Sequence, residues 1–174
     1  MAGNGAGHAL MEIRPCRASD CPAMCDIYNY YIENTVISFE EATLSVGEFE
    51  ERVAACTANY PWLVCVTDAG VAGYAYASRW QQRSAYRLCA ETTVYLKPGE
   101  TGRGYGRALY QALLPLMRKQ GLLVAIAGIA LPNEPSVRMH ERLGFNKVAH
   151  YPGVGWKFGR RVDVGYWQNN LGDG

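Results

Sequence analysis

The sequence predicts a mixed α/β domain with one central sheet, and three observations lead to that prediction. A length of 174 residues is the usual size of one domain with one core. A content of 49% hydrophobic and 19% charged residues indicates a globular chain rather than a disordered one. Segments with strand-like and helix-like periodicity follow in the order strand, two helices, three strands, helix, strand, helix and two strands. This order is typical of one mixed sheet flanked by helices.

The chain begins with a segment that does not resemble the rest. Residues 1–10 are small and rich in glycine, which predicts a flexible tail ahead of a single folded domain at 11–171. They lack the basic and long apolar stretches of a secretory signal. We therefore expect a cytoplasmic protein whose first strand covers residues 11–14.

Two helices are predicted next, each with a capping signal. Ser19 or Asp20 is expected to cap a helix over 21–31, which carries an apolar face. The segment Ser45–Glu48 has the pattern of a capping box, in which two side chains satisfy free backbone N–H groups, and it precedes a helix over 49–56.

The middle of the chain predicts a hairpin, a strand and a long helix. Residues 62–67 and 71–77 have strand character, and Asp-Ala-Gly between them accepts the backbone angles of a tight turn. A further strand is predicted over 89–96. After a glycine-bearing loop, apolar residues recur with helical period over 105–119.

The last third predicts a buried strand and three more elements. Residues 122–129 are continuously apolar, which favours a central strand covered on both faces and paired in parallel with 89–96. A short helix over 135–143 and strands over 146–151 and 161–168 complete the sheet.

Charge and hydropathy argue against two classes of partner. The formal net charge of +1 is too small for the basic surface of a nucleic-acid binder. The longest apolar run is much shorter than the roughly 20 residues of a membrane-spanning helix. Neither nucleic acid nor a membrane is expected as a partner.

The cysteines favour packing over metal binding or catalysis. Their positions contain no Cys-x-x-Cys pair and no histidine pair at zinc-ligand spacing, and no basic or histidine neighbour marks one as activated. We expect no metal site, and six reduced, packed thiols: Cys16, Cys21, Cys25, Cys56, Cys65 and Cys89.

The loop between strand 89–96 and helix 105–119 has the features of an anion cradle. Its three glycines let the backbone approach a ligand and turn N–H groups toward it. The helix that follows adds its positive dipole end, and two arginines add charge at the rim. The cradle comprises Gly102, Arg103, Gly104, Tyr105, Gly106 and Arg107.

The glycine spacing excludes the two best-known phosphate motifs. No Lys-Ser or Lys-Thr follows the glycines, so the loop is not a P-loop. The third glycine comes two residues after the second, whereas the dinucleotide fingerprint needs three. A different phosphate-bearing ligand is therefore expected.

Several motifs in the same order resemble the GNAT superfamily of N-acetyltransferases, and the resemblance covers residue 11 to about 171. It rests on the strand Glu91–Leu96, the loop to Gly106, Asn133, Ser136 and the segment Glu141–Phe145. Within the superfamily, the runs 75–77, 84–86, 93–96 and 163–167 look most like phosphinothricin and methionine sulfoximine acetyltransferases.

The resemblance implies acetyl-coenzyme A as the acetyl donor. It implies that the strand ending at Leu96 splays from its parallel neighbour and offers main-chain groups of Val94, Tyr95 and Leu96 to the pantetheine arm. The pyrophosphate would lie on the cradle, and Asn133 and Ser136 would contact the arm or the adenylate side. Relatives commonly form homodimers, so a homodimer is expected.

Two positions depart from the usual superfamily pattern. Thr101 stands where the loop usually opens with Gln or Arg, which leaves the backbone cradle intact. His140 stands where many relatives carry a tyrosine general acid, and the phosphinothricin branch shares this histidine.

Acetyl transfer to an amine needs a base, because amines of the lysine or α-amino type are largely protonated at neutral pH. Glu91 is the one ionisable acid in its strand and is the expected base, acting through a water, with a solvated residue on an exposed face as the alternative. His140 is expected to protonate the departing thiolate or to share the base role; a purely structural histidine is the alternative. A strand N–H near Val94 would stabilise the thioester oxygen.

Three arginines on the connection into the Glu91 strand suggest an acidic acceptor. At least one of Arg79, Arg83 and Arg87 is expected to reach the substrate and clamp a carboxylate or phosphinate of a small amino-acid-like acceptor, with a solvated charged loop as the alternative. Phe39 resembles the aromatic wall of the superfamily's substrate pocket, with a plain core residue as the alternative.

Two other functions stay open at this stage. One is an acetyltransferase for a polyamine, an aminoglycoside or a protein N-terminus, although a cationic acceptor would favour acidic residues near Glu91. The other is a non-catalytic acyl-coenzyme A sensor, which would have no use for Glu91. The sequence does not rank phosphinothricin, methionine sulfoximine, methionine sulfone and an ordinary metabolite as acceptors.

Overall fold

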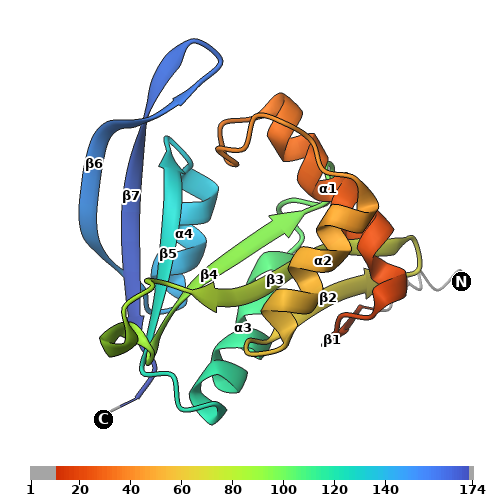
Figure 1. Ribbon diagram of the computed structural model, residues 1–174, viewed down its shortest axis with the longest axis horizontal. Coiled ribbons are helices and arrows are strands. Elements are labelled where there is room, and N and C mark those ends of the chain that lie inside the picture. The colour runs from red at the N-terminus through yellow and green to blue at the C-terminus, as the bar shows by residue number, and fades with distance from the viewer. Residues whose placement is uncertain (1–10, 173–174) are drawn as a thin grey trace, which may run out of the picture.

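A computed structural model describes residues 11–172 and contains a seven-stranded mixed sheet with helices on both faces (Figure 1). The strands lie in the order β1-β2-β3-β4-β5-β7-β6. The tail expected at residues 1–10 lies outside the described part of the chain.

The predicted order of strands and helices is confirmed. Strand β4 and helix α3 have the predicted bounds, because a change of hydrophobic period and a glycine mark their ends. The elements are β1 (Glu12–Pro15), α1 (Cys21–Asn34), α2 (Val46–Thr57), β2 (Trp62–Thr67), β3 (Gly70–Arg79), β4 (Cys89–Leu96), α3 (Tyr105–Lys119), β5 (Val124–Leu131), α4 (Glu134–Arg142), β6 (Asn146–Lys157) and β7 (Arg160–Asn170).

The capping box predicted for α2 is present, whereas the cap predicted for α1 makes no capping bond. The Ser45 hydroxyl accepts a hydrogen bond from the Glu48 N–H at 3.2 Å, and the Glu48 carboxylate accepts one from the Ser45 N–H at 2.8 Å, so α2 has the predicted capping box. Asp20 is the N-cap residue of α1, but its side chain makes no capping bond. It instead forms a two-pronged ion pair with Arg14, at 2.7 and 2.8 Å, and accepts from the N–H of Arg17 at 2.7 Å.

Two hydrophobic cores lie on the two faces of the sheet. Helices α1 and α2 cover one face with a cluster around Met24, Phe49 and Tyr74. Helix α3 covers the other face with a cluster around Leu109 and Leu113, and α4 packs behind β5 on the same side (Figure 1). The sheet is therefore the middle layer of three.

The parallel strands β4 and β5 separate halfway along, as the resemblance implied. Only three residue pairs join them, and the last is Glu91 with Ile126. Beyond that pair β4 stays bonded to β3 and β5 to β7, so the two strands diverge toward their C-terminal ends (Figure 1). The divergence leaves the facing edges without a partner strand, although Tyr31 donates to the Leu96 carbonyl at 2.7 Å and Thr92 donates to the Ile126 carbonyl at 3.3 Å.

Strand β6 is longer than predicted, because it continues through Pro152 and Gly153. The sequence suggested an end at Tyr151, since a Pro-Gly pair usually breaks a strand. Here the strand bulges between Tyr151 and Gly155, with Gly153 at a φ of 57°, and pairing with β7 then resumes. β6 is an edge strand, where a proline interrupts few ladder bonds.

Two further observations concern the chain as a whole. All six cysteines are free thiols, three of them buried. Within residues 11–172 no helix is long and apolar enough to cross a membrane, and no cluster of His, Cys, Asp and Glu side chains could hold a metal ion.

Candidate active site

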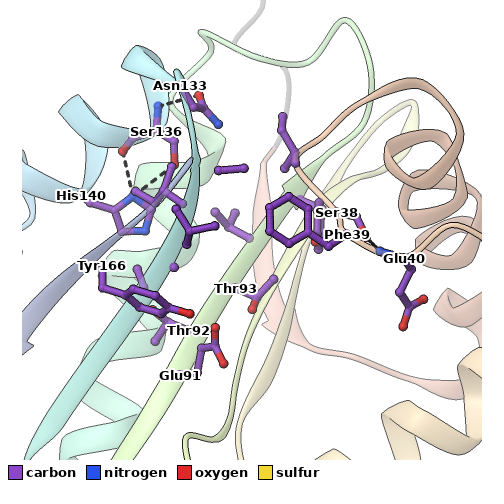
Figure 2. Close-up of a pocket in the computed structure, with 18 of the residues that line it drawn as sticks. Ser38, Phe39, Glu40, Glu91, Thr92, Thr93, Asn133, Ser136, His140 and Tyr166 are labelled. Carbon is purple, nitrogen blue, oxygen red and sulfur yellow. Dashed lines mark hydrogen bonds between the residues drawn. The ribbon is translucent and has the colours of Figure 1, made fainter. Parts of the chain in front are cut away.

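An open pocket of about 590 Å³ lies where β4 and β5 separate. Its walls come from the diverging strands, the loop between α1 and α2, helix α4, and strands β6 and β7 (Figure 2). Predicted site residues that line it are Phe39, Glu91, Val94, Tyr95, Asn133, Ser136 and His140.

Glu91 is a half-buried carboxylate without a partner. Among the described residues, no hydrogen bond or ion pair involves it. Burial therefore acts on it unopposed and raises its pKa above the ordinary value of a glutamate. A carboxylate that is free of cations, open to a pocket and raised in pKa has the properties of a general base.

Gly128 on β5 makes room for the side chains around Glu91. A Cβ at this position would lie 3.1 Å from the Tyr166 ring and 3.5 Å from Glu91 Oε1. Figure 2 shows the phenol of Tyr166, on β7, extending toward the Glu91 carboxylate. Trp80 packs edge-on against the Tyr166 ring at 5.4 Å between centroids, which fixes its position.

His140 lies on the opposite side of the pocket, on α4, and is 2% exposed. Its Nδ1 lies 2.8 Å from the carbonyl oxygen of Ser136, and its Nε2 lies 2.9 Å from the hydroxyl of Tyr110. Burial lowers its pKa, although the Ser136 carbonyl counteracts this by stabilising a ring N–H. Both ring nitrogens therefore have partners within the protein.

One wall of the pocket is built by two segments that are distant in sequence. The Phe39 ring lies against the backbone of Gly155, where an added Cβ would come within 2.4 Å of it. The buried ammonium of Lys157 donates a hydrogen bond of 2.6 Å to the Ser38 carbonyl. These contacts attach the loop after α1 to the hairpin of β6 and β7.

The pocket lining is acidic. Glu40 and Glu91 line it, and no lysine or arginine does. Glu40 is bound by Arg52 at 2.5 Å, on the side of α2, and its second carboxylate oxygen is buried without a hydrogen-bond partner in the described chain.

The structure does not bring the three predicted clamp arginines into this pocket. Arg79 and Arg87 line a separate groove of about 730 Å³ beside Arg52, and this groove shares no lining residue with the pocket around Glu91. Arg83 is exposed and precedes a short 3-10 turn (Ser84–Tyr86). Contact of these arginines with an acceptor stays a prediction.

The glycine loop has the backbone geometry of an anion cradle. Gly102 and Gly104 have φ values of 78° and 84°, which favour glycine, and an added Cβ at either would point into open space. Gly104 is the N-cap residue of α3, so the first N–H groups of that helix are unpaired within it. Gly106 packs closely, since a Cβ there would meet Met139 Sδ at 2.9 Å. The loop residues fit a pyrophosphate group.

Several pocket residues had no signal in the sequence. Tyr166 and Thr93 belong to runs that resemble the superfamily but carried no sign of a site role, Gly128 lies on a strand whose pattern indicates only burial, and Glu40 is an ordinary loop residue. Tyr110 has the spacing of a core residue of α3. Other lining residues are Tyr28, Ile37, Ser38, Thr92, Ala127, Ile129, Ala130, Val154 and Val164.

Comparison with protein families gives a match over almost all of the described chain. The family described as "Acetyltransferase (GNAT) domain" matches residues 13–165.

Two characterised relatives are similar over nearly their full length. The chain is 41% identical over 161 residues to phosphinothricin N-acetyltransferase of Streptomyces viridochromogenes, covering 92% of this chain and 88% of the relative. It is 35% identical over 165 residues to the L-methionine sulfoximine/L-methionine sulfone acetyltransferase of Salmonella typhimurium, covering 92% and 95%.

Among solved structures, the chain is similar to a GNAT superfamily phosphinothricin acetyltransferase from Sinorhizobium meliloti in complex with acetyl-coenzyme A. The TM-score is 0.91 at 34% identity, covering 94% of this chain and 90% of the other.

Proposed function

The chain belongs to the GNAT acetyltransferase family and is an acetyl-coenzyme A-dependent N-acetyltransferase, and we propose that its acceptor is the amino group of a small amino-acid-like substrate. The phosphinothricin, methionine sulfoximine and methionine sulfone types are the proposed acceptors, because these names belong to relatives at 35–41% identity. The observation that carries the proposal is the unpaired, half-buried Glu91 at the fork of the strands.

We assign Glu91 as the base that removes a proton from the acceptor ammonium, through one water. Burial places its pKa closer to neutral pH than the pKa of an exposed glutamate. This suits a group that must both take up and release a proton. Tyr166 and Gly128 line the space beside the Glu91 carboxylate.

The acetyl donor would be held by the chain at three places. The cradle from Gly102 to Arg107 would bind the pyrophosphate, main-chain groups of Val94–Leu96 the pantetheine arm, and Asn133 with Ser136 the same arm or the adenylate side. When bound, acetyl-coenzyme A supplies an activated thioester. The Val94 N–H would face the thioester oxygen and stabilise its developing negative charge.

His140 stays the proposed acid that protonates the sulfur as the carbon–sulfur bond breaks, and this role requires its Nε2–H to exchange the Tyr110 hydroxyl, 2.9 Å away, for the sulfur. It lies on the α3 and α4 side of the sheet, whereas Glu91 lies on the α1 and α2 side, so the two groups approach the fork from opposite faces (Figure 2). A base and an acid on opposite sides of the reacting carbonyl suit direct transfer without an enzyme nucleophile.

The acidic lining of the pocket favours a second candidate acceptor class. Glu40 and Glu91 without a lysine or arginine would suit a cationic acceptor, such as a polyamine, an aminoglycoside or a protein N-terminus. An amino acid needs a cation for its carboxylate, and Arg79, Arg83 and Arg87 stay the proposed source.

We also propose that the enzyme is a cytoplasmic homodimer in which a second copy covers β6. Five apolar side chains at or next to this edge strand are 51–64% exposed, namely Val148, Tyr151, Val154, Trp156 and Phe158. An exposed apolar edge of this kind marks an interaction surface. The free cysteines are consistent with a reducing compartment.

The test of the acceptor is thiol release from acetyl-coenzyme A with five amines in parallel: methionine sulfoximine, phosphinothricin, methionine sulfone, spermidine and an aminoglycoside. Highest kcat/KM on the first three supports the proposal. Turnover confined to the two cationic amines would replace the acceptor class and retain the donor. Equilibrium sedimentation tests the dimer, with Trp156→Lys expected to shift it to monomer.

A further inference from the structure

A slot of about 170 Å³ lies outside the pocket around Glu91, between helices α1 and α2 and the sheet. Its lining includes five aromatic residues, namely Tyr28, Phe49, Trp62, Tyr74 and Tyr76. An apolar cavity of about 150 Å³ is large enough to hold a benzene molecule. The slot therefore has the room and the lining for one six-membered ring.

The aromatic rings of the slot hold one another in place. Trp62 stacks on Tyr76 at 3.9 Å between centroids and on Tyr74 at 5.6 Å. Phe49 packs edge-on against Trp62 at 6.0 Å. The slot is therefore formed before a ligand arrives, which lowers the ordering cost of binding.

The slot opens into the groove that contains Arg79 and Arg87. Arg52, Cys56 and Ser78 line both hollows, so the two adjoin. Arg52 lies on α2, and Arg79 lies at the end of β3. Three guanidinium groups therefore line a groove of about 730 Å³ that continues into an aromatic slot.

Arg79 and Arg87 are not paired with acidic residues in the described chain. Among residues 11–172, neither aspartate nor glutamate lines the groove, and no ion pair involves either arginine. Their side-chain hydrogen bonds go to neutral groups, the Gln82 amide oxygen at 3.2 Å and the Ser84 carbonyl at 3.5 Å. Like charges in one groove repel each other, and an anion bound between them offsets that repulsion. A carboxylate matches the fork of N–H donors on a guanidinium.

We propose that the slot and the groove form a second ligand site, which binds a small aromatic carboxylate. The ring occupies the slot, and the carboxylate lies in the groove between the guanidiniums of Arg52, Arg79 and Arg87. An inorganic anion would leave the slot empty, and a neutral aromatic compound would leave the arginine charges unbalanced. Arg83 does not line the groove, so it stays available for the carboxylate of the acceptor.

Arg52 links this second site to the pocket around Glu91. Its Nη1 bonds Glu40 at 2.5 Å, and Glu40 lines that pocket. A carboxylate in the groove therefore competes with Glu40 for the same guanidinium. Because exposed ion pairs are weak, Glu40→Gln should tighten ligand binding by only about 1.5-fold to fivefold.

The test is calorimetric titration of the enzyme, with coenzyme A present at saturation so that the proposed cradle is occupied. The probes are benzoate, phenylacetate and 3-phenylpropionate, which differ in the reach from ring to carboxylate. Benzyl alcohol keeps the ring without the charge, and inorganic phosphate keeps the charge without the ring. We expect one site per chain with a Kd below about 1 mM for at least one acid, and binding roughly tenfold weaker or more for the two controls.

Variants of three exposed arginines locate the carboxylate. Arg79→Gln and Arg87→Gln should each weaken binding of the best acid by about fivefold or more, because each removes a charge-assisted hydrogen bond. Arg83→Gln is the matched control, since it removes the same charge from the same connection outside the groove, and it should change binding by less than about twofold. Nuclear Overhauser contacts from the ligand ring to Trp62 and Tyr76 would locate the ring in the slot.

Absence of binding by all three acids would overturn the proposal. So would equal losses in the three arginine variants, which would indicate attraction by net charge alone, or phosphate binding as tight as that of the best acid. Displacement of the acid by methionine sulfoximine would place it in the pocket around Glu91 and would also reject a second site. The titration needs no acetyl transfer, so failure of all five amines would reject the proposed function and leave this site measurable.

Discussion

Replacement of Glu91 by glutamine is the most direct test of the proposed chemistry. The substitution keeps the size of the side chain and removes its ability to take a proton. No other group in the pocket is free to replace it, because Glu40 is bound by Arg52 at 2.5 Å and both ring nitrogens of His140 have partners. The loss should therefore be close to the full contribution of a general base.

The size of the effect follows from the range for general base catalysis. Loss of such a group lowers the rate by about 10²- to 10⁴-fold, which corresponds to about 2.7 to 5.5 kcal/mol of barrier. Binding of acetyl-coenzyme A should be nearly unchanged, because the proposed cradle at Gly102–Arg107 belongs to the loop before α3 and the first turn of that helix, whereas Glu91 lies on β4.

The stability of the variant separates lost chemistry from lost structure. Burial raises the folded-state pKa of Glu91 above its unfolded value, so the stability it contributes is fully present below the unfolded pKa, about 4.3, and is lost as pH rises through the folded pKa. Glutamine cannot ionise and escapes this loss. At pH 7 Glu91→Gln should therefore unfold at the same temperature as wild type or a higher one.

The assay is thiol release from acetyl-coenzyme A across pH 5 to 9, with calorimetric titration for donor binding. Wild-type kcat should fall on the acidic side, at a pH above the ordinary glutamate pKa, and the variant should lack this limb. Glu51→Gln, on an exposed glutamate of α2, is the matched control. An unchanged pH profile in Glu91→Gln, or a rate within threefold of wild type, would refute the base assignment.

Three further changes test the cradle, the space around the base and the start of the fold. Gly104→Ala forces alanine to a φ of 84°, which costs about 1 kcal/mol, so KM for acetyl-coenzyme A should rise and melting temperature fall while kcat changes less. Gly128→Ala places a Cβ 3.1 Å from the Tyr166 ring, so kcat/KM for the amine should drop at least tenfold while donor binding by calorimetry stays constant. Asp20→Asn should destabilise by about 2 kcal/mol in chemical unfolding at pH 7. Because Arg14 lowers the pKa of Asp20, wild-type stability from this pair is present above pH about 4 and is lost as pH falls through the folded pKa, so the two proteins should converge in acid.

Local signals in the sequence were sufficient for most of the fold. The bounds of β4 and α3 match because strand alternation, a glycine loop and a 3.6-residue period are all properties of neighbouring residues. Strand β6 extends beyond its prediction because pairing with β7 holds Pro152 and Gly153 within a bulge, and pairing is a contact between distant residues.

The site was predictable only in part for the same reason. Chemistry pointed to Glu91 and resemblance to His140, whereas Tyr110 and Thr92 join the pocket lining through contacts across 30 and 18 residues of sequence. The arginines illustrate the reverse case. Their closeness in sequence suggested one clamp, but the turn after β3 places Arg79 and Arg87 in a different groove from Glu91.

Two contacts, Phe39 with Gly155 and Lys157 with Ser38, define a part of the molecule whose sequence can evolve at a different rate from the rest. They join segments 119 residues apart into the wall proposed to meet the acceptor, and neither segment carries the proposed base or cradle. Substitutions in the β6 and β7 hairpin can therefore reshape that wall while proton transfer and donor binding are inherited unaltered. A gene duplicate of this enzyme could acquire a new acceptor by drift in one hairpin.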